Sequence, residues 1–345
     1  MQVELKQTLT AAQEDAWNRR LLALPNAHPF QALYARVLWP QSKAFHYLLA
    51  YEGERLEAAA LIREHSVAGL LKRWTIFRGP LCATPEDLRS ILPPLFEHAE
   101  SQGVMSVTLS PYFENTEAIQ AESVLEECGA RLCAIQGGHT QSVTVDLRLD
   151  EQEILRGFND NTRRQIRKAE ELAIDVAPPR SDDEARAFVA IYQRMSEERG
   201  ADPLREEYLL RFRDLTLASL DPHGVFLLAR YDGKIVAGIL LLHNHEQSWY
   251  IHGASDFSYR QIPLTFLLHW RAMQLLKARR IERYNFGGLE SLDDERKAIR
   301  GISQFKLGFS KTVVTCTHEY ERILSPLTSA TDRALRTVGR ALRKR

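Results

Sequence analysis

Residues 284–288 read Tyr-Asn-Phe-Gly-Gly, and residues 301–309 read Gly-Ile-Ser-Gln-Phe-Lys-Leu-Gly-Phe. The first stretch is typical of the end of a buried strand whose two glycines let another group approach the backbone. In the second stretch we predict a short strand that carries Lys306 between Phe305 and Leu307. A lysine in such apolar surroundings is either one half of an ion pair or a site residue whose charge meets a negative group.

The length and charge of the chain limit what it can be. Its 345 residues suggest two domains, at about 150 residues per domain. The 45 basic and 45 acidic residues give no net charge, so an anionic partner must be met by a local patch. No apolar run is long enough to span a membrane, and the first residues lack the core of a signal peptide. We therefore expect a cytoplasmic protein.

Metal binding is not predicted. The four cysteines form no CxxC pair, and we expect reduced thiols. His243 and His245 share one face of a predicted strand, but no third ligand lies near them in the sequence.

Strands and helices follow one another in two similar series, which predicts the α+β class. The first series, residues 1–148, has predicted strands at 3–9, 45–51, 55–63, 74–78, 104–109 and 142–146, and helices at 11–23, 30–39, 84–102 and 116–128. The second series, residues 149–311, has predicted helices at 151–172, 182–199, 206–217 and 263–278, and strands at 225–231, 234–244, 247–253, 283–286 and 304–309. We infer two copies of one fold, with residues 312–330 returning to the first copy and residues 331–345 forming a basic amphipathic helix.

Four segments carry a family likeness. In chain order they are Arg163–Glu170, then Gly253-Ala254-Ser255 with Arg260 and Pro263, then residues 284–288, then residues 301–309. Upstream, Phe30-Gln31 and Arg78-Gly79-Pro80 add to it. Together these segments resemble the Fem (FemABX) family of aminoacyl-tRNA-dependent transferases. The resemblance implies two GNAT-like (acyl-CoA N-acyltransferase-like) domains in tandem with a cleft, without the coiled-coil insertion of some members.

The resemblance also implies an activity. Fem transferases move an amino acid from aminoacyl-tRNA to the free amino group of a peptidoglycan precursor stem peptide and so build an interpeptide bridge. The expected partners are aminoacyl-tRNA and a lipid-linked or UDP-linked precursor. Peripheral contact with the inner membrane surface is an open alternative. DNA is not an expected partner. Because the ester is already activated, neither a cofactor nor a metal is expected.

Lys306 matches the catalytic lysine of the family. Attack of an amine on the ester builds negative charge on the carbonyl oxygen, and one fixed donor stabilises such a charge by about 3–4 kcal/mol. The alternative is an ion pair between Lys306 and a carboxylate across the sheet.

Nine further residues are candidates for substrate binding. They are Phe305, Tyr250, His252, Arg260, Gly287, Gly288, Arg205, Tyr208 and Arg36. We expect Tyr250 and His252 to share a strand face that lines the acceptor cleft, with core packing as the alternative for Tyr250. Gly287 and Gly288 permit backbone hydrogen bonds to a peptide, or form a plain turn.

The chain departs from the family pattern at positions that bear on the acceptor. Asn285 and Ser110 stand where members often have acids, and Arg36 is the nearest basic residue to an expected lysine. Arg205 and Tyr208 match the acceptor-binding Arg and Tyr only loosely. These differences allow an acceptor other than the usual precursor.

Two basic segments are candidates for contact with phosphates. Arg163, Arg164, Arg167 and Lys168 cover one broad face of a predicted helix. One interpretation is that these side chains bind the phosphates of tRNA or the pyrophosphate of a precursor. The alternative is a solvated helix face whose charges form ion pairs with Glu170 and Glu171. In the tail, Arg333, Arg336, Arg340 and Arg343 recur at helical spacing. We expect that tail to bind RNA, to lie on an anionic membrane surface, or to fray in solvent.

Other functions remain open at this stage. An acyl-CoA-dependent N-acyltransferase of GNAT type is the first, although the chain lacks the Arg/Gln-x-x-Gly-x-Gly/Ala loop that holds pyrophosphate in such enzymes. The others are aminoacyl transfer to a non-cell-wall acceptor and a binding protein that keeps the fold without the activity.

Overall fold

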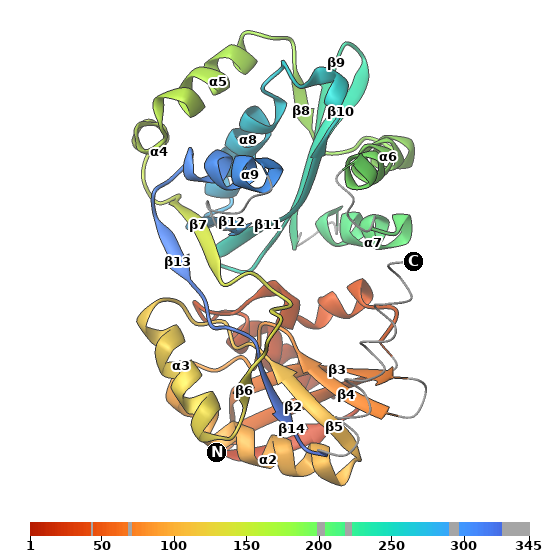
Figure 1. Cartoon of the computed structure of the whole chain (residues 1–345), viewed down its shortest axis with the longest axis vertical. Coiled ribbons are helices and arrows are strands. Elements are labelled where there is room, and N and C mark those ends of the chain that lie inside the picture. The colour runs from red at the N-terminus through yellow and green to blue at the C-terminus, as the bar shows by residue number, and fades with distance from the viewer. Residues whose placement is uncertain (43, 68–70, 199–203, 218–222, 290–296, 326–345) are drawn as a thin grey trace. The chain divides into compact units, whose positions relative to one another are not determined.

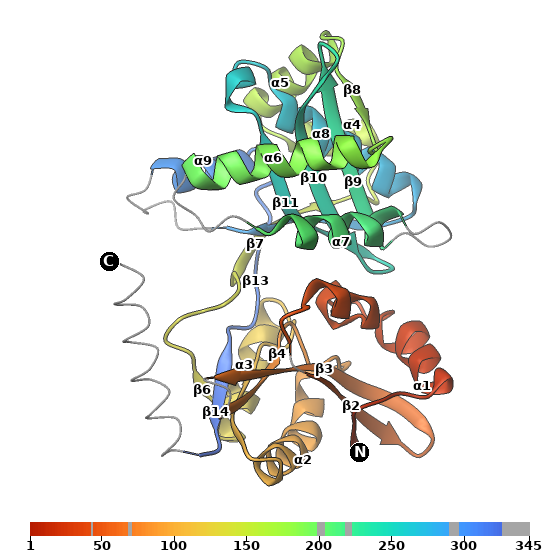
Figure 2. The ribbon, with the colours of Figure 1, turned by 90° about the vertical axis from the view of Figure 1, so that its right-hand side faces the viewer.

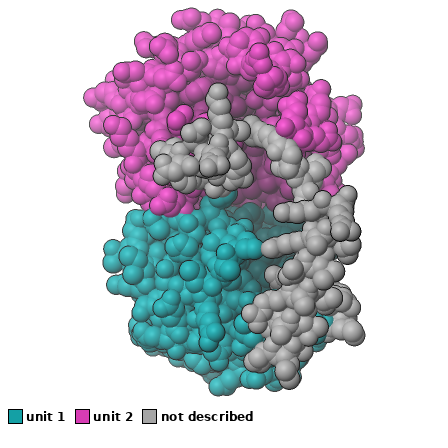
Figure 3. All heavy atoms as spheres, in the orientation of Figure 1, with its two compact units in different colours: residues 1–140, 315–345 teal, residues 141–314 magenta. Residues whose placement is uncertain are grey.

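The computed structural model describes residues 1–42, 44–67, 71–198, 204–217, 223–289 and 297–325. The predicted helix at 331–345 lies outside these residues. The chain divides into two compact units, residues 1–140 with the segment from Thr315 onward, and Gln141–Val314 (Figure 3). Each unit contains a seven-stranded mixed sheet with helices, which confirms the predicted α+β class.

The sheet of unit 1 has the strand order β1-β2-β3-β4-β5-β14-β6. These strands are β1 (Gln2–Lys6), β2 (Ala44–Glu52), β3 (Arg55–Val67), β4 (Leu71–Ile76), β5 (Val104–Leu109), β14 (Tyr320–Ile323) and β6 (Arg131–Leu132). β4 and β5 run parallel, and the other neighbours are antiparallel. The chain thus returns from unit 2 to insert β14 between β5 and β6.

Short helices and two longer ones complete unit 1. They are α1 (Ala11–Ala16), η1 (Trp17–Leu21), η2 (Pro29–Gln31), η3 (Leu33–Leu38), η4 (Pro85–Asp87), α2 (Leu88–Ser101) and α3 (Thr116–Glu127). Thr84 and Asp87 form a reciprocal capping box at the start of η4, which continues into α2. The apolar face of α2 packs into the core of this unit.

The sheet of unit 2 has the order β13-β7-β12-β11-β10-β9-β8. These strands are β13 (Val313–Thr315), β7 (Gln141–Asp146), β12 (Arg283–Gly288), β11 (Gln247–Ser255), β10 (Lys234–His243), β9 (Gly224–Tyr231) and β8 (Asp175–Ala177). β9, β10 and β11 form the predicted meander, with a tight turn at Asp232 and Gly233, which both have positive φ. β11 pairs with β12 in parallel at residues 247–249 only.

The helices of unit 2 lie on both faces of this sheet (Figures 1 and 2). They are α4 (Glu151–Gly157), α5 (Asp160–Glu170), α6 (Asp182–Glu198), α7 (Glu206–Leu217), η5 (Phe257–Tyr259), α8 (Leu264–Ala278) and α9 (Lys297–Leu307). α6 and α7 cover one face, and α8 and α9 cover the other (Figure 1). Among the described residues, no helix has the length and apolar character needed to cross a membrane.

The predicted strand at 304–309 is wrong. Lys306 lies on helix α9, where the buried residues Ser303 and Lys306 are three positions apart, as helical packing requires. The two glycines of this stretch suggested a short strand, but one lies within the helix and the other directly after it.

Two further boundaries differ from the prediction. The segment 142–146 belongs to unit 2, because β7 pairs with β12, so the first boundary lies at 140/141 rather than after residue 148. The predicted long helix at 151–172 is two helices, since Phe158 is extended and the Asn159 side chain caps α5.

Candidate active site

The Tyr-Asn-Phe-Gly-Gly stretch ends strand β12, and its side chains hold neighbouring elements. The Tyr284 hydroxyl lies 2.5 Å from Nδ1 of His269 on α8. Oδ1 of Asn285 accepts hydrogen bonds from the Gly287 backbone N–H, at 2.8 Å, and from the Ser142 hydroxyl. Asn285 therefore fixes the bend of the chain at the strand end.

The first glycine of the pair is required by geometry. Gly287 has φ +67°, and a Cβ there would lie 2.8 Å from the carbonyl oxygen of Tyr250. Only glycine allows this bend so close to β11. The next carbonyl, that of Gly288, accepts a hydrogen bond from Nζ of Lys306.

Lys306 lies in aromatic surroundings. It is 7 % exposed, and the rings of Phe286, Phe305 and Phe309 gather around His269 with centroid distances of 4.9 to 5.7 Å. Burial, and next the charge of Lys306, lower the pKa of His269 to about 3. Burial raises the pKa of Tyr284 well above its usual value. At neutral pH both His269 and Tyr284 are therefore uncharged, and the charge of Lys306 acts on His269.

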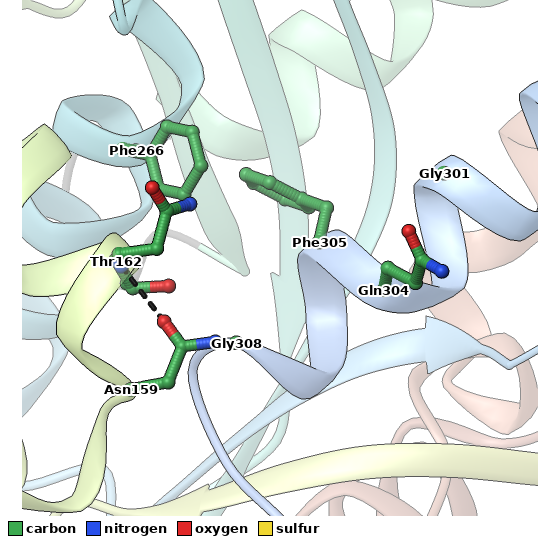
Figure 4. Close-up of a pocket in the computed structure, with 8 residues that line it drawn as sticks. Asn159, Thr162, Phe266, Gly301, Gln304, Phe305 and Gly308 are labelled. Carbon is green, nitrogen blue, oxygen red and sulfur yellow. Dashed lines mark hydrogen bonds between the residues drawn. The ribbon is translucent and has the colours of Figure 1, made fainter.

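A cavity of about 340 Å³ lies between α5, α8 and α9 (Figure 4). Its lining residues are Asn159, Asn161, Thr162, Phe266, Gly301, Gln304, Phe305 and Gly308. The four residues of the α9 segment recur at helical spacing and form one face. The cavity therefore adjoins Phe305, the residue before Lys306.

Tyr250 and His252 do not share a face, contrary to the prediction. Leu240 pairs with His252 and Leu241 with Tyr250, so Ile251 is an extra residue that forms a bulge in β11. The ring of Tyr250 packs 4.7 Å from His269 on the α8 side. A bulge shifts the alternation of side chains, which a period of two in the sequence cannot reveal.

His252 lies instead on the α6 and α7 side. Its Nδ1 is 3.3 Å from the Tyr192 hydroxyl, and its Nε2 is 3.4 Å from the Tyr208 hydroxyl. Burial lowers the pKa of His252 to about 4. The structure thus brings His252 and Tyr208 together and leaves Lys306, Phe305, Tyr250, Gly287 and Gly288 as a second group.

Three predicted arginines lie outside both groups or at their edge. Arg205 is exposed just before α7, and its carbonyl accepts the first hydrogen bonds of that helix. Arg260 is exposed, with its guanidinium 4.7 Å from the ring centroid of Phe257. Arg36 belongs to unit 1, where it donates to the Tyr47 hydroxyl at 2.7 Å.

Some of the basic side chains of α5 form hydrogen bonds within the chain. Arg163 donates to the carbonyls of Arg156, at 3.1 Å, and Phe158, which joins α5 to the end of α4. Arg164 donates to Asn161 at 2.8 Å, and Lys168 lies 3.5 Å from the Gln261 carbonyl. Arg164, Arg167 and Lys168 are exposed.

The upstream segments of the likeness contact one another within unit 1. The Gln31 amide donates to the Phe77 carbonyl at 2.8 Å, and a Cβ at Gly79 would lie 2.5 Å from the Gln31 side chain. Ser110 accepts a hydrogen bond from the Arg78 backbone at 3.1 Å. These residues position the backbone of unit 1.

Two features of the site were missed by sequence reasoning. His269 stands in no motif, and only a fold places it beside Lys306. The cavity-lining face of α9 would have been visible as helical spacing at 301, 304, 305 and 308, had that stretch been predicted as a helix. Among the described residues, no three His, Cys, Asp or Glu side chains gather into a group that could hold a metal ion.

Comparison with known proteins decides the family. The model of the FemAB family matches residues 32–215, which is more than half of the chain. The chain belongs to the FemAB family. A model of the acetyltransferase (GNAT) domain matches residues 156–306. The predicted family resemblance is confirmed, and family and fold mark the FemAB chain as a transferase of the acyltransferase type.

Solved structures show the same fold at low identity. The crystal structure of FemX is 15 % identical, with 96 % of this chain and 99 % of that chain covered and a TM-score of 0.82. A tandem GNAT protein from the clavulanic acid biosynthesis pathway is 13 % identical, with 94 % and 99 % covered and a TM-score of 0.57. The C-terminal domain of a putative lysylphosphatidylglycerol synthetase from Agrobacterium fabrum is 15 % identical, with 88 % and 91 % covered and a TM-score of 0.57. The predicted pair of GNAT-like domains is confirmed. A search of curated proteins found no match.

Proposed function

We propose that this FemAB protein transfers an amino acid from aminoacyl-tRNA to a free amino group of a peptidoglycan precursor stem peptide. One observation carries the proposal. Lys306 holds a buried ammonium group at the end of β12, where Nζ donates to the Gly288 carbonyl. Family membership and the GNAT-type fold support acyl transfer as the reaction class.

The chemistry needs such a cation. The amine nitrogen bonds to the ester carbonyl carbon, the carbon–oxygen bond to the ribose breaks, and the ribose oxygen takes up the proton that the amine loses. Negative charge forms first on the carbonyl oxygen and then on the leaving oxygen. A fixed ammonium group in a site of low polarity stabilises that charge by about 3–4 kcal/mol.

The remaining residues take roles around Lys306. Phe305 and Tyr250 would contact the aminoacyl end, and the backbone of Gly287 and Gly288 would hydrogen-bond to it. The exposed Arg164, Arg167 and Lys168 would meet tRNA phosphates, whereas Arg163 is engaged in joining α4 to α5.

The acceptor would meet a different set of residues. Tyr208 and His252, with Arg205 and Arg260 at the surface, would contact the precursor. Arg36 of unit 1 stays a separate prediction for substrate binding. We place the reaction in the cytoplasm, with peripheral contact at the inner face of the membrane when the precursor is lipid-linked.

Mass spectrometry tests the proposal directly. The purified protein is incubated with a set of charged tRNAs and with either the lipid-linked or the UDP-linked precursor. We expect a mass increase of one aminoacyl residue, and uncharged tRNA serves as the control. The absence of such a product with every charged tRNA would contradict the proposal.

An acyl-CoA-dependent N-acyltransferase is the second candidate, because the GNAT domain model covers residues 156–306. Isothermal titration with CoA separates the two functions. We expect no binding of CoA, and tight binding would favour the second candidate.

A further inference from the structure

Arg78 of unit 1 differs from the other arginine that the structure buries. Among the described residues, the buried arginines are Arg78, at 9 % exposed, and Arg230, at 8 % exposed. Nε of Arg230 donates to Oε1 of Glu184 at 2.9 Å, so a carboxylate balances the charge of Arg230. Arg78 forms no ion pair with any acid in the part of the chain that the structure describes. A buried charge without such a partner is costly, and its presence calls for a reason.

The guanidinium of Arg78 uses little of its hydrogen-bonding capacity. Nη2 donates to the His139 carbonyl at 2.7 Å, which is the one side-chain hydrogen bond of Arg78 among the described residues. Nitrogen atoms that are fully buried without a partner occur elsewhere, as at Nε of Arg322, but not in Arg78. Nε and Nη1 of Arg78 are therefore accessible from solvent, although most of the side chain is buried.

Aromatic rings and a glycine fix the plane of this guanidinium. Its Cζ lies 5.3 Å from the ring centroid of Phe77 and 5.4 Å from that of Tyr112. A Cβ at Gly138 would lie 3.0 Å from the Phe77 ring and 3.1 Å from Nη2 of Arg78, so the backbone at Gly138 packs directly against both. The Tyr112 hydroxyl donates to Glu114 at 2.9 Å, and Glu114 forms no ion pair with Arg78. A group that binds the guanidinium thus meets donors whose orientation is already set.

The histidine next to this cluster adds no charge. The ring centroids of His28 and Tyr112 lie 5.2 Å apart, and Nδ1 of His28 accepts from the Phe30 backbone N–H at 3.2 Å. Burial, and next the charge of Arg78, lower the pKa of His28 well below its usual value. At neutral pH His28 is therefore uncharged.

The backbone holds Arg78 in a conformation that favours glycine. Its φ is 59°, and its N–H donates to the hydroxyl oxygen of Ser110 at 3.1 Å. Residues other than glycine persist in this region at a cost, and they gather at sites that bind ligands. The guanidinium and the backbone of Arg78 are thus two independent features that stability alone does not explain.

We propose that Arg78 is the binding residue of an oxyanion site in unit 1, which takes a carboxylate or phosphate group of a small ligand. The planar fork of a guanidinium binds either group through two parallel hydrogen bonds, and the anion balances the buried charge. The inference goes beyond the proposed function, because every residue of this site belongs to unit 1 and none takes part in the transfer step at Lys306.

Isothermal titration calorimetry tests the site with two probes, inorganic phosphate and acetate. Chloride keeps the ionic strength constant, because salt screens binding to surface charges. We expect the wild-type protein to bind at least one of the two anions, and the anion that binds more tightly identifies the group that the site takes. Arg78→Gln should weaken this binding about tenfold or more, because it removes charged hydrogen bonds.

Two further variants control the test. Arg280→Gln removes an exposed arginine after α8 that has nearly the same backbone conformation, with φ 63°, and should bind as the wild-type protein does. Arg78→Lys keeps the charge without the planar fork and should bind more weakly than the wild-type protein. It keeps the test decisive if Arg78→Gln fails to fold.

Failure of the wild-type protein to bind either anion would overturn the inference, as would an unchanged affinity in either Arg78 variant. An equal loss in Arg280→Gln would also overturn it, because the binding would then follow net charge alone. Normal transfer from charged tRNA without anion binding would defeat this inference and leave the proposed function intact. Anion binding that depends on Arg78, without transfer, would support this inference and contradict the proposed function.

Discussion

The two faces of the sheet in unit 2 each carry a histidine paired with tyrosine, yet they differ in charge. On the α8 and α9 face, His269 and Tyr284 lie beside Lys306. On the α6 and α7 face, His252 lies between the hydroxyls of Tyr192 and Tyr208. Only the first cluster holds a buried cation among the residues that the structure describes around these two histidines.

Under the proposed function, the two faces of this sheet take different tasks. The pKa of His269 is lowered by burial and by the charge of Lys306, whereas that of His252 is lowered by burial alone. A buried cation can stabilise a developing anion, but a neutral His–Tyr cluster can only hydrogen-bond. The bulge at Ile251 divides the two tasks, because it turns Tyr250 to one face and His252 to the other.

The largest expected loss of stability comes from the bend on the Lys306 side. Gly287→Ala should lower the free energy of unfolding by about 3 kcal/mol, because φ is positive and the new Cβ meets a backbone oxygen. Gly238→Ala on the α6 side should cost less, since its Cβ meets only side-chain atoms of Phe188 and Leu228, which can shift. Urea unfolding measures both variants. Equal losses would contradict the strained bend.

A smaller difference is expected between two tyrosines. Tyr284→Phe leaves buried Nδ1 of His269 without its partner at 2.5 Å and should cost about 2 kcal/mol. Tyr208→Phe removes a hydroxyl 3.4 Å from His252 and should cost less. Thermal and urea unfolding would rank the pair, and the reverse order would show that the His269 cluster is not the tighter one.

The smallest effect, for a change of one pH unit, is a dependence of stability on pH. Both histidines have folded pKa values below the usual 6.5, about 3 for His269 and about 4 for His252. Below pH 6.5 the unfolded chain therefore binds protons that the folded chain does not, and stability falls as pH falls. Each histidine contributes about 1.4 kcal/mol per pH unit between 6.5 and its folded pKa.

Single substitutions resolve the two contributions. His269→Phe and His252→Phe should each flatten the slope of unfolding free energy against pH between pH 6 and pH 4.5. An unchanged slope in either variant would mean that the pKa of the histidine in question does not differ between the folded and unfolded protein.

The sequence predicted the class, the family and most strands, because alternation and turn residues mark them locally. The meander of β9 to β11 and the capped start of α2 follow directly from such signals. The pair of GNAT-like domains was predicted from the resemblance of four segments, in their order, to the Fem family.

The errors have physical causes beyond local pattern. Gly301 and Gly308 made α9 resemble a short strand, although burial recurs at helical spacing. The placement of Tyr250 and His252 failed because one extra residue in β11 is set by pairing with β10. The membership of β7 in unit 2 depends on its pairing with β12, a contact that is remote in the sequence.

The transfer rate of Lys306→Met tests the central claim most directly. Single-turnover transfer is measured at saturating charged tRNA, together with the dissociation constant for the same tRNA. Lys277→Met is the control, because Lys277 also donates to backbone carbonyls in unit 2, those of Leu147 and Leu149, away from this site. We predict a rate lowered about 10²–10³-fold in Lys306→Met with an unchanged dissociation constant, and a normal rate in the control. An undiminished rate, or a loss that lies entirely in tRNA binding, would contradict the role of Lys306 in stabilising the reacting oxygen.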